Sequence, residues 1–236
     1  MSNAVLLAMD PRQYANDGPF LNEERILSWF GLADAFWGYK DNPSPEKPHA
    51  ELTSGLCSNG YFDCPQLLSY PNVAEILGRQ LALCLKVSGV KRVDWVISSA
   101  YSAITFGHEV AKALGARFMN TEKDPADPKK QLWQRIVLPQ GAQVLQVEEL
   151  ITTWGTTTAV RQAIKHGNPN AVDFLQVVGT LVLRPPDLAA MNREHPVIAL
   201  VEKEIWAKRP EDCPLHVVGS IALKPKTHWA QLTGKA

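Results

Sequence analysis

In the first part of the chain, apolar residues recur at the intervals of one helix face. After about residue 90 they form short runs that alternate with helical stretches. Apolar side chains spaced three and four apart predict amphipathic helices over 23–36 and 72–86. A proline-rich, charged linker is predicted over 41–48, and two short strands around a Ser/Gly/Asn turn are predicted over 49–63. The first part is therefore expected to combine helices with a small β element.

From residue 93 onward, short apolar runs alternate with helical stretches. Helices are predicted over 107–114 and over the stretch that ends at His166. Strands are predicted at 93–97, 116–119, 144–147 and 174–183. Alternation of this kind predicts an α/β fold with a mostly parallel, twisted sheet flanked by helices.

The connections after three of these strands carry most of the reactive polar side chains. The stretches 98–106 and 120–134 are expected to be loops, and an acid pair, Glu148 and Glu149, follows the third strand. Ligands of open parallel sheets bind outside the carboxyl ends of the strands. These three connections are therefore expected on one edge of the sheet, around one active site.

The stretch 144–158 is the most informative part of the chain. After the strand and the acid pair comes a loop of small, hydroxyl-rich residues that leads into a helix: Thr152, Thr153, Gly155, Thr156 and Thr157. Free backbone N–H groups and the helix dipole favour an anion at such a place. Carboxylates suit ribose hydroxyls or a divalent cation. The order predicts a sugar-phosphate site; an ordinary capped helix after a solvated loop is the alternative.

Composition excludes several classes of protein. The 236 residues, with 45% hydrophobic and 20% charged positions, are typical of one substantial globular domain. The 24 basic and 24 acidic residues give a net charge of zero, which argues against a broad nucleic-acid or membrane surface. No apolar run is long enough to span a bilayer. Since the N-terminus has no charged region of the secretory type, a cytoplasmic location is expected.

Four cysteines are too few and too scattered for a disulfide scaffold: Cys57, Cys64, Cys84 and Cys213. Cys213 and His216 have the two-residue spacer of half a zinc site. Cys57 and Cys64 could complete such a site only if the fold brought them together. Because buried free thiols are common, the sequence leaves this metal site open.

Several motifs occur together in a fixed order along the chain. They are the acid-acid-Leu-Ile-Thr-Thr-Trp-Gly-Thr stretch from Glu148, Ser54-Gly55 with Ser58 and Tyr61-Phe62, Ser99-Ala100-Tyr101-Ser102-Ala103-Ile104, the pair Glu122-Lys123, and Arg184. The first resembles the motif that binds phosphoribosyl diphosphate (PRPP) in type I phosphoribosyltransferases. The others resemble elements of the orotate phosphoribosyltransferase branch. The resemblance extends over about residues 49–219.

The resemblance implies a fold and an activity. The fold would be that of type I phosphoribosyltransferases, with a helical segment and small hood in residues 1–90 and a PRPP-binding core with a C-terminal extension in residues 91–236, as one compact unit. The activity would be transfer of the 5-phosphoribosyl group from PRPP to a nucleobase, with orotate favoured, and release of pyrophosphate. Mg²⁺ as cofactor and a homodimer are also implied.

The resemblance assigns roles residue by residue. Glu148, Glu149 and Lys123 would be catalytic, and the two glutamates would also reach Mg²⁺, mostly through PRPP and water. The residues expected to bind PRPP are Ser99, Ala100, Tyr101, Ser102, Lys129, Lys130, Thr152, Thr153, Gly155, Thr156 and Thr157. The residues expected to contact the base are Tyr61, Phe62 and Arg184.

The chain departs from the family pattern at a few positions. Trp154 stands in place of a glycine, and Ser102 and Thr53 stand in place of two lysines. A charge-assisted hydrogen bond contributes about 1.5–3 kcal/mol, so lost cations would weaken catalysis. Nearby cations that could replace them are Lys129, Lys130 and Arg135. The alternatives are a non-catalytic PRPP or nucleotide sensor, and a transferase for another base.

Overall fold

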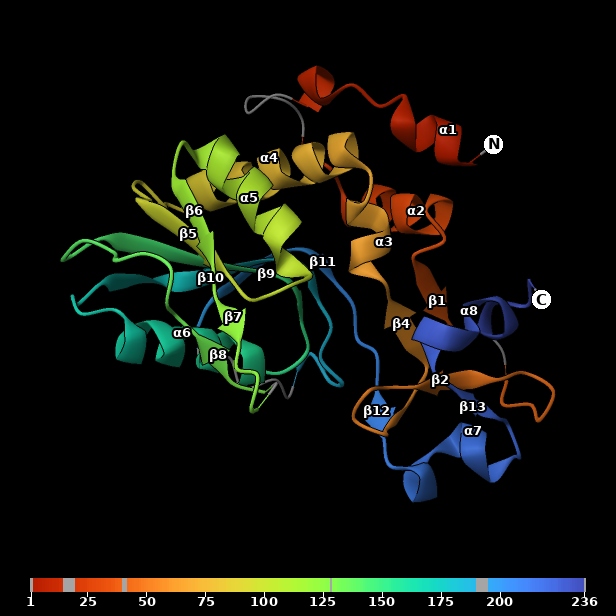
Figure 1. Cartoon of the computed structure of the whole chain (residues 1–236). Helices are drawn as coiled ribbons and strands as arrows, with labels where there is room; N and C mark the ends of the chain where they lie inside the picture. The colour runs from red at the N-terminus through yellow and green to blue at the C-terminus, as the bar shows by residue number, and fades with distance from the viewer. Residues whose placement is uncertain (1, 15–19, 40–41, 128, 190–194, 236) are drawn as a thin grey trace.

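The structure is a computed structural model that describes residues 2–14, 20–39, 42–127, 129–189 and 195–235. A five-stranded parallel sheet forms its centre (Figure 1). In order across the sheet, the strands are β11 (Val197–Glu202), β10 (Asp173–Leu183), β9 (Gln143–Ile151), β5 (Trp95–Ser98) and β6 (Arg117–Asn120). The predicted α/β class with a mostly parallel sheet is confirmed.

Helices cover both faces of this sheet (Figure 1). They are α2 (Glu23–Leu32), α4 (Pro71–Val87) and α5 (Ala103–Leu114) on one face, and α6 (Gly155–Gly167) on the other. The side chains of β5 alternate between the faces: Val96 joins the core under α4 and α5, whereas Trp95 and Ile97 join the core under α6. A strand that is buried on both faces is apolar throughout, which explains the uninterrupted apolar run.

The strand order reverses between β5 and β9. From β5 the chain passes through α5 to β6 on one side, and then crosses back to β9 on the other side of β5. The register places Ile97 opposite Gln146, so the residues that follow each of them lie side by side at the carboxyl ends. A reversal of this kind is where open parallel sheets bind their ligands.

A smaller part, which we call the hood, combines residues 36–39 and 42–62 with residues 205–235 (Figure 1). Its four-stranded sheet has the order β12-β3-β2-β13, and the antiparallel pair β1-β4 lies beside it. The bounds are β1 (Phe36–Gly38), β2 (His49–Glu51), β3 (Cys57–Ser58), β4 (Gly60–Phe62), β12 (Ala207–Lys208), η2 (Pro210–Asp212), α7 (Pro214–Val217), β13 (Ala222–Leu223) and α8 (Pro225–Thr233). The hood sheet joins segments from both sides of position 90, and the division into parts at that position stays a prediction.

Most of the predicted elements are confirmed, but the first helix is shorter than expected. It ends at Leu32 and not at residue 36, because Asp34 adopts a left-handed conformation with φ of 53°. The chain then turns into β1, where the Phe36 ring lies 4.5 Å from the Phe62 ring. The apolar positions after Leu32 thus serve a strand pair. Asp41, the first residue of the predicted linker, lies outside the described residues.

Four other expectations about the core need correction. The stretch 98–106 is only partly a loop, since α5 begins at Ala103. The stretch 120–134 contains an antiparallel pair, β7 (Glu122–Lys123) with β8 (Gln131–Leu132). The third strand, β9, extends to Ile151, so the acid pair lies within it; the series does not end with β10, because β11 adds a fifth strand.

Three short helices complete the described chain: α1 (Ser2–Leu7), η1 (Pro11–Tyr14) and α3 (Cys64–Leu68). Both α1 and η1 pack near α4, which extends the apolar core on that side of the sheet. Within the described ranges, no helix has both the length and the hydropathy to cross a bilayer.

Candidate active site

The predicted loops meet around one cavity of about 670 Å³ at the carboxyl edge of the sheet. Predicted site residues that line it are Lys123, Glu148, Glu149, Ser99, Ala100, Tyr101, Ser102, Lys129, Thr153, Gly155 and Thr156. The remaining lining residues are Gln131, Leu150 and Lys226. The cavity therefore collects side chains from the ends of β5 and β9, the β7–β8 hairpin and the start of α6.

Glu148 is buried at the floor of this cavity, with 2% of its surface exposed. The register of β5 and β9 brings it beside Ser99, whose hydroxyl donates a hydrogen bond of 2.5 Å to Glu148 Oε2. Gln146 Nε2 donates to the other carboxylate oxygen at 2.9 Å. Burial raises the pKa of Glu148 to about 7, against the opposing effect of these two bonds. The carboxylate is thus fixed in position and easily protonated.

Glu149 points to the opposite side of the strand and into the polar part of the cavity. Burial is the main effect that raises its pKa. Hydrogen bonds from its own backbone N–H, from that of Leu150 and from Ser102 oppose the rise, as does the charge of Lys123. Lys123 also lies over the ring of Tyr101, with Nζ 5.7 Å from the ring centroid. Acid and base thus face each other across the cavity.

The start of α6 offers backbone donors to the cavity. No side chain caps this helix, and its first backbone bond runs from Thr158 N–H to the Trp154 carbonyl at 2.8 Å. The N–H groups of Gly155 and Thr156 precede that bond and have no acceptor among the described residues. Both residues line the cavity. An uncapped helix start of this kind suits an anion.

The base-side candidates lie next to Glu149 but not in the cavity lining. Cys64 Sγ donates to the Glu149 carbonyl at 3.6 Å and lies near both Tyr61 and Arg184. Arg184 is 8% exposed, and within the described ranges no carboxylate forms an ion pair with it. Burial lowers its pKa and raises the pKa of Tyr61 to about 12. A buried cation without a protein anion beside a cavity suits an anionic ligand.

Comparison with known proteins gives the family. No family model matches the chain. An orotate phosphoribosyltransferase of Pelotomaculum thermopropionicum is 33% identical over 177 residues, which are 75% of this chain and 87% of that relative. The chain belongs to the orotate phosphoribosyltransferase family. A second family member, from Desulforamulus reducens, is 34% identical over 177 residues, again 75% of this chain and 87% of the relative.

A solved structure shows the same fold. The orotate phosphoribosyltransferase of Aeropyrum pernix has a TM-score of 0.50 at 20% identity, and the match covers 74% of this chain and 92% of that chain. The predicted type I phosphoribosyltransferase fold is confirmed. As a member of the orotate phosphoribosyltransferase family, the chain is a pentosyltransferase-type enzyme.

Trp154, where the family pattern has a glycine, does not distort the phosphate-type loop. Its φ of −80° and ψ of −1° are ordinary for any residue. The indole, 9% exposed, packs in a small apolar cluster with Ile151, Val178 and Leu183, and its ring lies 5.9 Å from that of His195. Trp154 is also absent from the cavity lining, so its indole does not fill the cavity.

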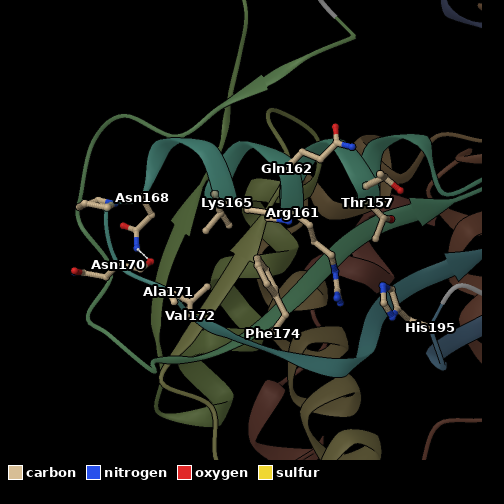
Figure 2. A pocket seen from close by; sticks show the side chains of 13 residues that line it. Thr157, Arg161, Gln162, Lys165, Asn168, Asn170, Ala171, Val172, Phe174 and His195 are labelled. Carbon is tan, nitrogen blue, oxygen red and sulfur yellow. Dashed lines mark hydrogen bonds between the residues drawn. The ribbon is translucent and has the colours of Figure 1, made fainter.

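Four predicted residues lie elsewhere. Lys130 and Thr152 do not line the cavity. Thr157 is buried and faces a second cavity of about 600 Å³ between α6 and the start of β10, shown in Figure 2 with Arg161 over the ring of Phe174. Phe62 is 3% exposed and packs in the hydrophobic core. Their assignment to ligands stays a prediction that these positions do not support.

The cations that could replace the missing lysines divide in two. Lys129 lines the cavity, whereas Arg135 forms an ion pair with Glu122 outside it. A cation that sequence reasoning missed is Lys226, which the C-terminal helix α8 brings to the cavity. No spacing or motif in the sequence links Lys226 to the acid pair. The lysine reaches the cavity because β13 pairs with β2 and thereby positions α8.

Proposed function

We propose that this chain transfers the 5-phosphoribosyl group of PRPP to orotate and releases pyrophosphate. The observation that carries the proposal is the meeting of two carboxylates, an uncapped helix start and three lysines around one cavity at the sheet reversal. The reaction breaks the bond from ribose C1 to the pyrophosphate oxygen and forms a bond from C1 to the base nitrogen. Negative groups under the ribose and positive groups around the leaving group match the charges that develop.

In this proposal the phosphate and the ribose occupy the inner half of the cavity. The 5′-phosphate binds the N–H groups of Gly155 and Thr156 with the hydroxyls of Thr153 and Thr156. The ribose hydroxyls lie on Glu149 and, deeper, on Glu148, which Ser99 and Gln146 orient. When ionised, these carboxylates carry the negative charge that favours the cationic sugar of the transition state.

The pyrophosphate lies under the three lysines of the outer half, in the same proposal. Lys123 and Lys129 reach it from the β7–β8 hairpin, and Lys226 reaches it from α8. Ser99, Ala100, Tyr101 and Ser102 form the opposing wall. Lys226 supplies the positive charge that Ser102 and Thr53 do not, which argues for turnover and against a sensor that only binds PRPP.

The base is proposed to lie outside Glu149, where Tyr61 and Arg184 meet. Arg184 would pair with the carboxylate of orotate, because the guanidinium is buried and no described carboxylate neutralises it. An uncharged base would leave Arg184 without an anion. This supports orotate over a neutral purine or pyrimidine.

Magnesium fits one of the two carboxylates better than the other. Glu148 is 2% exposed and both its oxygens accept hydrogen bonds, whereas Glu149 is only half-buried and lines the cavity as a hard oxygen donor. Glu149 would therefore hold Mg²⁺, with most other ligands coming from PRPP and water. When bound, the cation would neutralise charge on the pyrophosphate. A homodimer and a cytoplasmic location remain expectations from the resemblance and from composition.

The proposal is tested by mixing the chain with PRPP, Mg²⁺ and orotate and following the loss of orotate absorbance. We expect turnover that needs all three, with stoichiometric release of pyrophosphate. Calorimetric titration with PRPP is run in parallel. PRPP binding without turnover of any base would establish the sensor alternative. Turnover with another base alone would show that the chain is a transferase for that base and not for orotate.

A further inference from the structure

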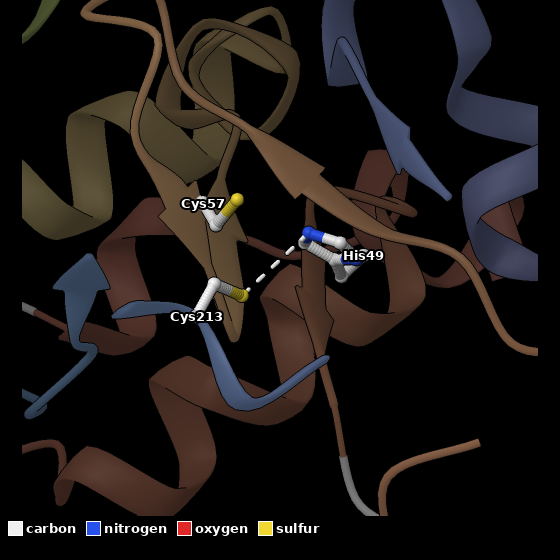
Figure 3. Close-up of side chains that lie close together, drawn as sticks. All are labelled: His49, Cys57 and Cys213. Carbon is white, nitrogen blue, oxygen red and sulfur yellow. Dashed lines mark hydrogen bonds between the residues drawn. The ribbon is translucent and has the colours of Figure 1, made fainter. Parts of the chain in front are cut away.

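Four side chains of the metal-ligand type converge in the hood, away from the cavity. Figure 3 shows three of them, His49 on β2, Cys57 on β3 and Cys213 before α7, pointing toward one another. Their ligand atoms all lie within 4.8 Å of one another, and each residue is at most 1% exposed. His216 Nδ1 lies 3.8 Å from Cys57 Sγ on the exposed side.

Two sulfur–nitrogen distances in this group are close to those of a tetrahedral zinc site. With zinc–sulfur bonds of about 2.3 Å and zinc–nitrogen bonds of about 2.0 Å, a tetrahedron separates its S and N ligands by about 3.5 Å. Cys213 Sγ lies 3.8 Å from His49 Nε2, and Cys57 Sγ lies 3.8 Å from His216 Nδ1. His49, Cys57 and Cys213 are thus already close enough to share one ion, and a movement of the exposed His216 ring from its place beside Cys57 would add the fourth ligand.

A hydrogen bond outside the cluster fixes the ring of His49 in the form that binds metal. The Ser220 hydroxyl donates its proton to the Lys47 carbonyl at 2.6 Å, so at 2.8 Å it accepts from His49 Nδ1. Nδ1 therefore carries the proton, and the lone pair of Nε2 faces Cys213. Metal-binding histidines are typically held in this way.

A backbone hydrogen bond also favours the metal-binding form of one of the two sulfurs. The His216 backbone N–H donates to Cys213 Sγ at 3.4 Å, a bond that stabilises a thiolate. Both cysteines would bind the metal as thiolates, so each thiol would give up its proton. Metal binding displaces thiol protons in this way in structural zinc sites.

We propose that His49, Cys57, Cys213 and His216 bind one Zn²⁺ that holds the hood together. Two thiolates and two imidazoles form a closed Cys₂His₂ set with no open position, so the ion is structural. It ties β2 and β3 to the segment that continues into β13 and α8. Since α8 carries Lys226, the ion also fixes the helix that completes the cavity.

The first test uses the wild-type chain, purified under reducing conditions without a nickel column. Elemental analysis is expected to find about one zinc per chain, and chelation is expected to remove it and lower the thermal midpoint. Replacement by Co²⁺ should give thiolate-to-cobalt charge-transfer absorption. A reduced wild-type chain that contains no zinc and takes up none at micromolar concentration would overturn the proposal, as would a Cys57–Cys213 disulfide in its place.

The second test identifies the ligands by variants. Cys57→Ser, Cys213→Ser and His49→Ala are each expected to reduce zinc affinity about 100-fold or more, and Ser220→Ala about 10-fold or more. Cys84→Ser, on α4 outside the cluster, is the matched control and should bind like the wild type. If the ligand variants do not fold, the wild-type zinc content, the cobalt spectrum and the chelation result decide. Equal zinc uptake by ligand variants and control would contradict the assignment.

Discussion

The cavity at the sheet edge and the cluster in the hood hold their polar groups in opposite ways. In the cavity, Glu148 and Glu149 keep pKa values raised by burial and face lysines across an open space. In the hood, His49 and Cys213 are fully buried, and their side chains lie 3.8 Å apart. The buried carboxylates of the cavity lower the stability of the unliganded fold, and a bound ligand would offset this. The hood cluster has room only for an ion. Substitutions in the cavity should therefore change activity, and substitutions in the hood should change stability.

The largest effect is expected from Glu149→Gln. Removing the charge should lower kcat/KM for PRPP by about 10³-fold, because the carboxylate stabilises charge that develops in the transition state. Circular dichroism and the thermal midpoint should stay close to wild type. Glu122→Gln, whose parent pairs with Arg135 outside the cavity, is the matched control. An unchanged kcat/KM in Glu149→Gln would remove the ribose assignment.

The second effect is a pH dependence of stability that belongs to Glu148. Its pKa of about 7 in the folded chain exceeds the ordinary glutamate value of 4.5, so the folded state binds more protons between these two pH values. The free energy of unfolding should then fall as pH rises from 4.5 to 7, by about 3 kcal/mol from this group.

Urea unfolding of the wild type and Glu148→Gln at several pH values isolates this effect. The variant should gain stability relative to the wild type as pH rises through that window. A difference that stays constant from pH 5 to 8 would show that Glu148 is not buried with a raised pKa.

The third prediction concerns Trp154→Gly, a substitution in the phosphate-type loop beside the cavity that should nevertheless change stability and not activity. Trp154→Gly restores the family residue and empties the apolar cluster with Ile151 and Val178. We expect a loss of about 2–4 kcal/mol in the free energy of unfolding. The backbone is already ordinary, so kcat/KM below the melting range should stay within about threefold of wild type. A large gain in activity would mean that the indole does obstruct the site.

The smallest effect is expected from Lys226→Ala. Removing one exposed cation from the leaving-group side should lower kcat about tenfold. Lys224→Ala, on the same helix start but outside the cavity lining, should change kcat by less than twofold. If both variants behaved alike, Lys226 would be a surface residue only.

The sequence predicted the cavity well because its parts are local or follow a general rule. The acid pair, the loop and the helix are contiguous, and the carboxyl-edge rule brought the Ser99 loop to them. The partner of Glu148 could not be predicted in this way. It depends on the β5–β9 register, which periodicity alone leaves open by two residues.

The hood was largely beyond sequence reasoning because its contacts join distant segments. His49 is a single histidine before a short strand, and nothing near it indicates that Cys213 lies 3.8 Å away. The same pairing of β2 with β13 brings Lys226 to the cavity. Cys64, which spacing also allowed as a zinc ligand, instead contacts the Glu149 carbonyl. Asp34 ended a helix early through a left-handed conformation that the apolar pattern does not show.

A crystal structure with orotidine 5′-monophosphate, the proposed product, is the most direct test of the central claim. The account predicts the phosphate on the N–H groups of Gly155 and Thr156, the ribose hydroxyls on Glu149, and the pyrimidine carboxylate on Arg184. A nucleotide bound in the second cavity, beside Phe174, would contradict the account. So would a nucleotide whose phosphate lies away from the start of α6.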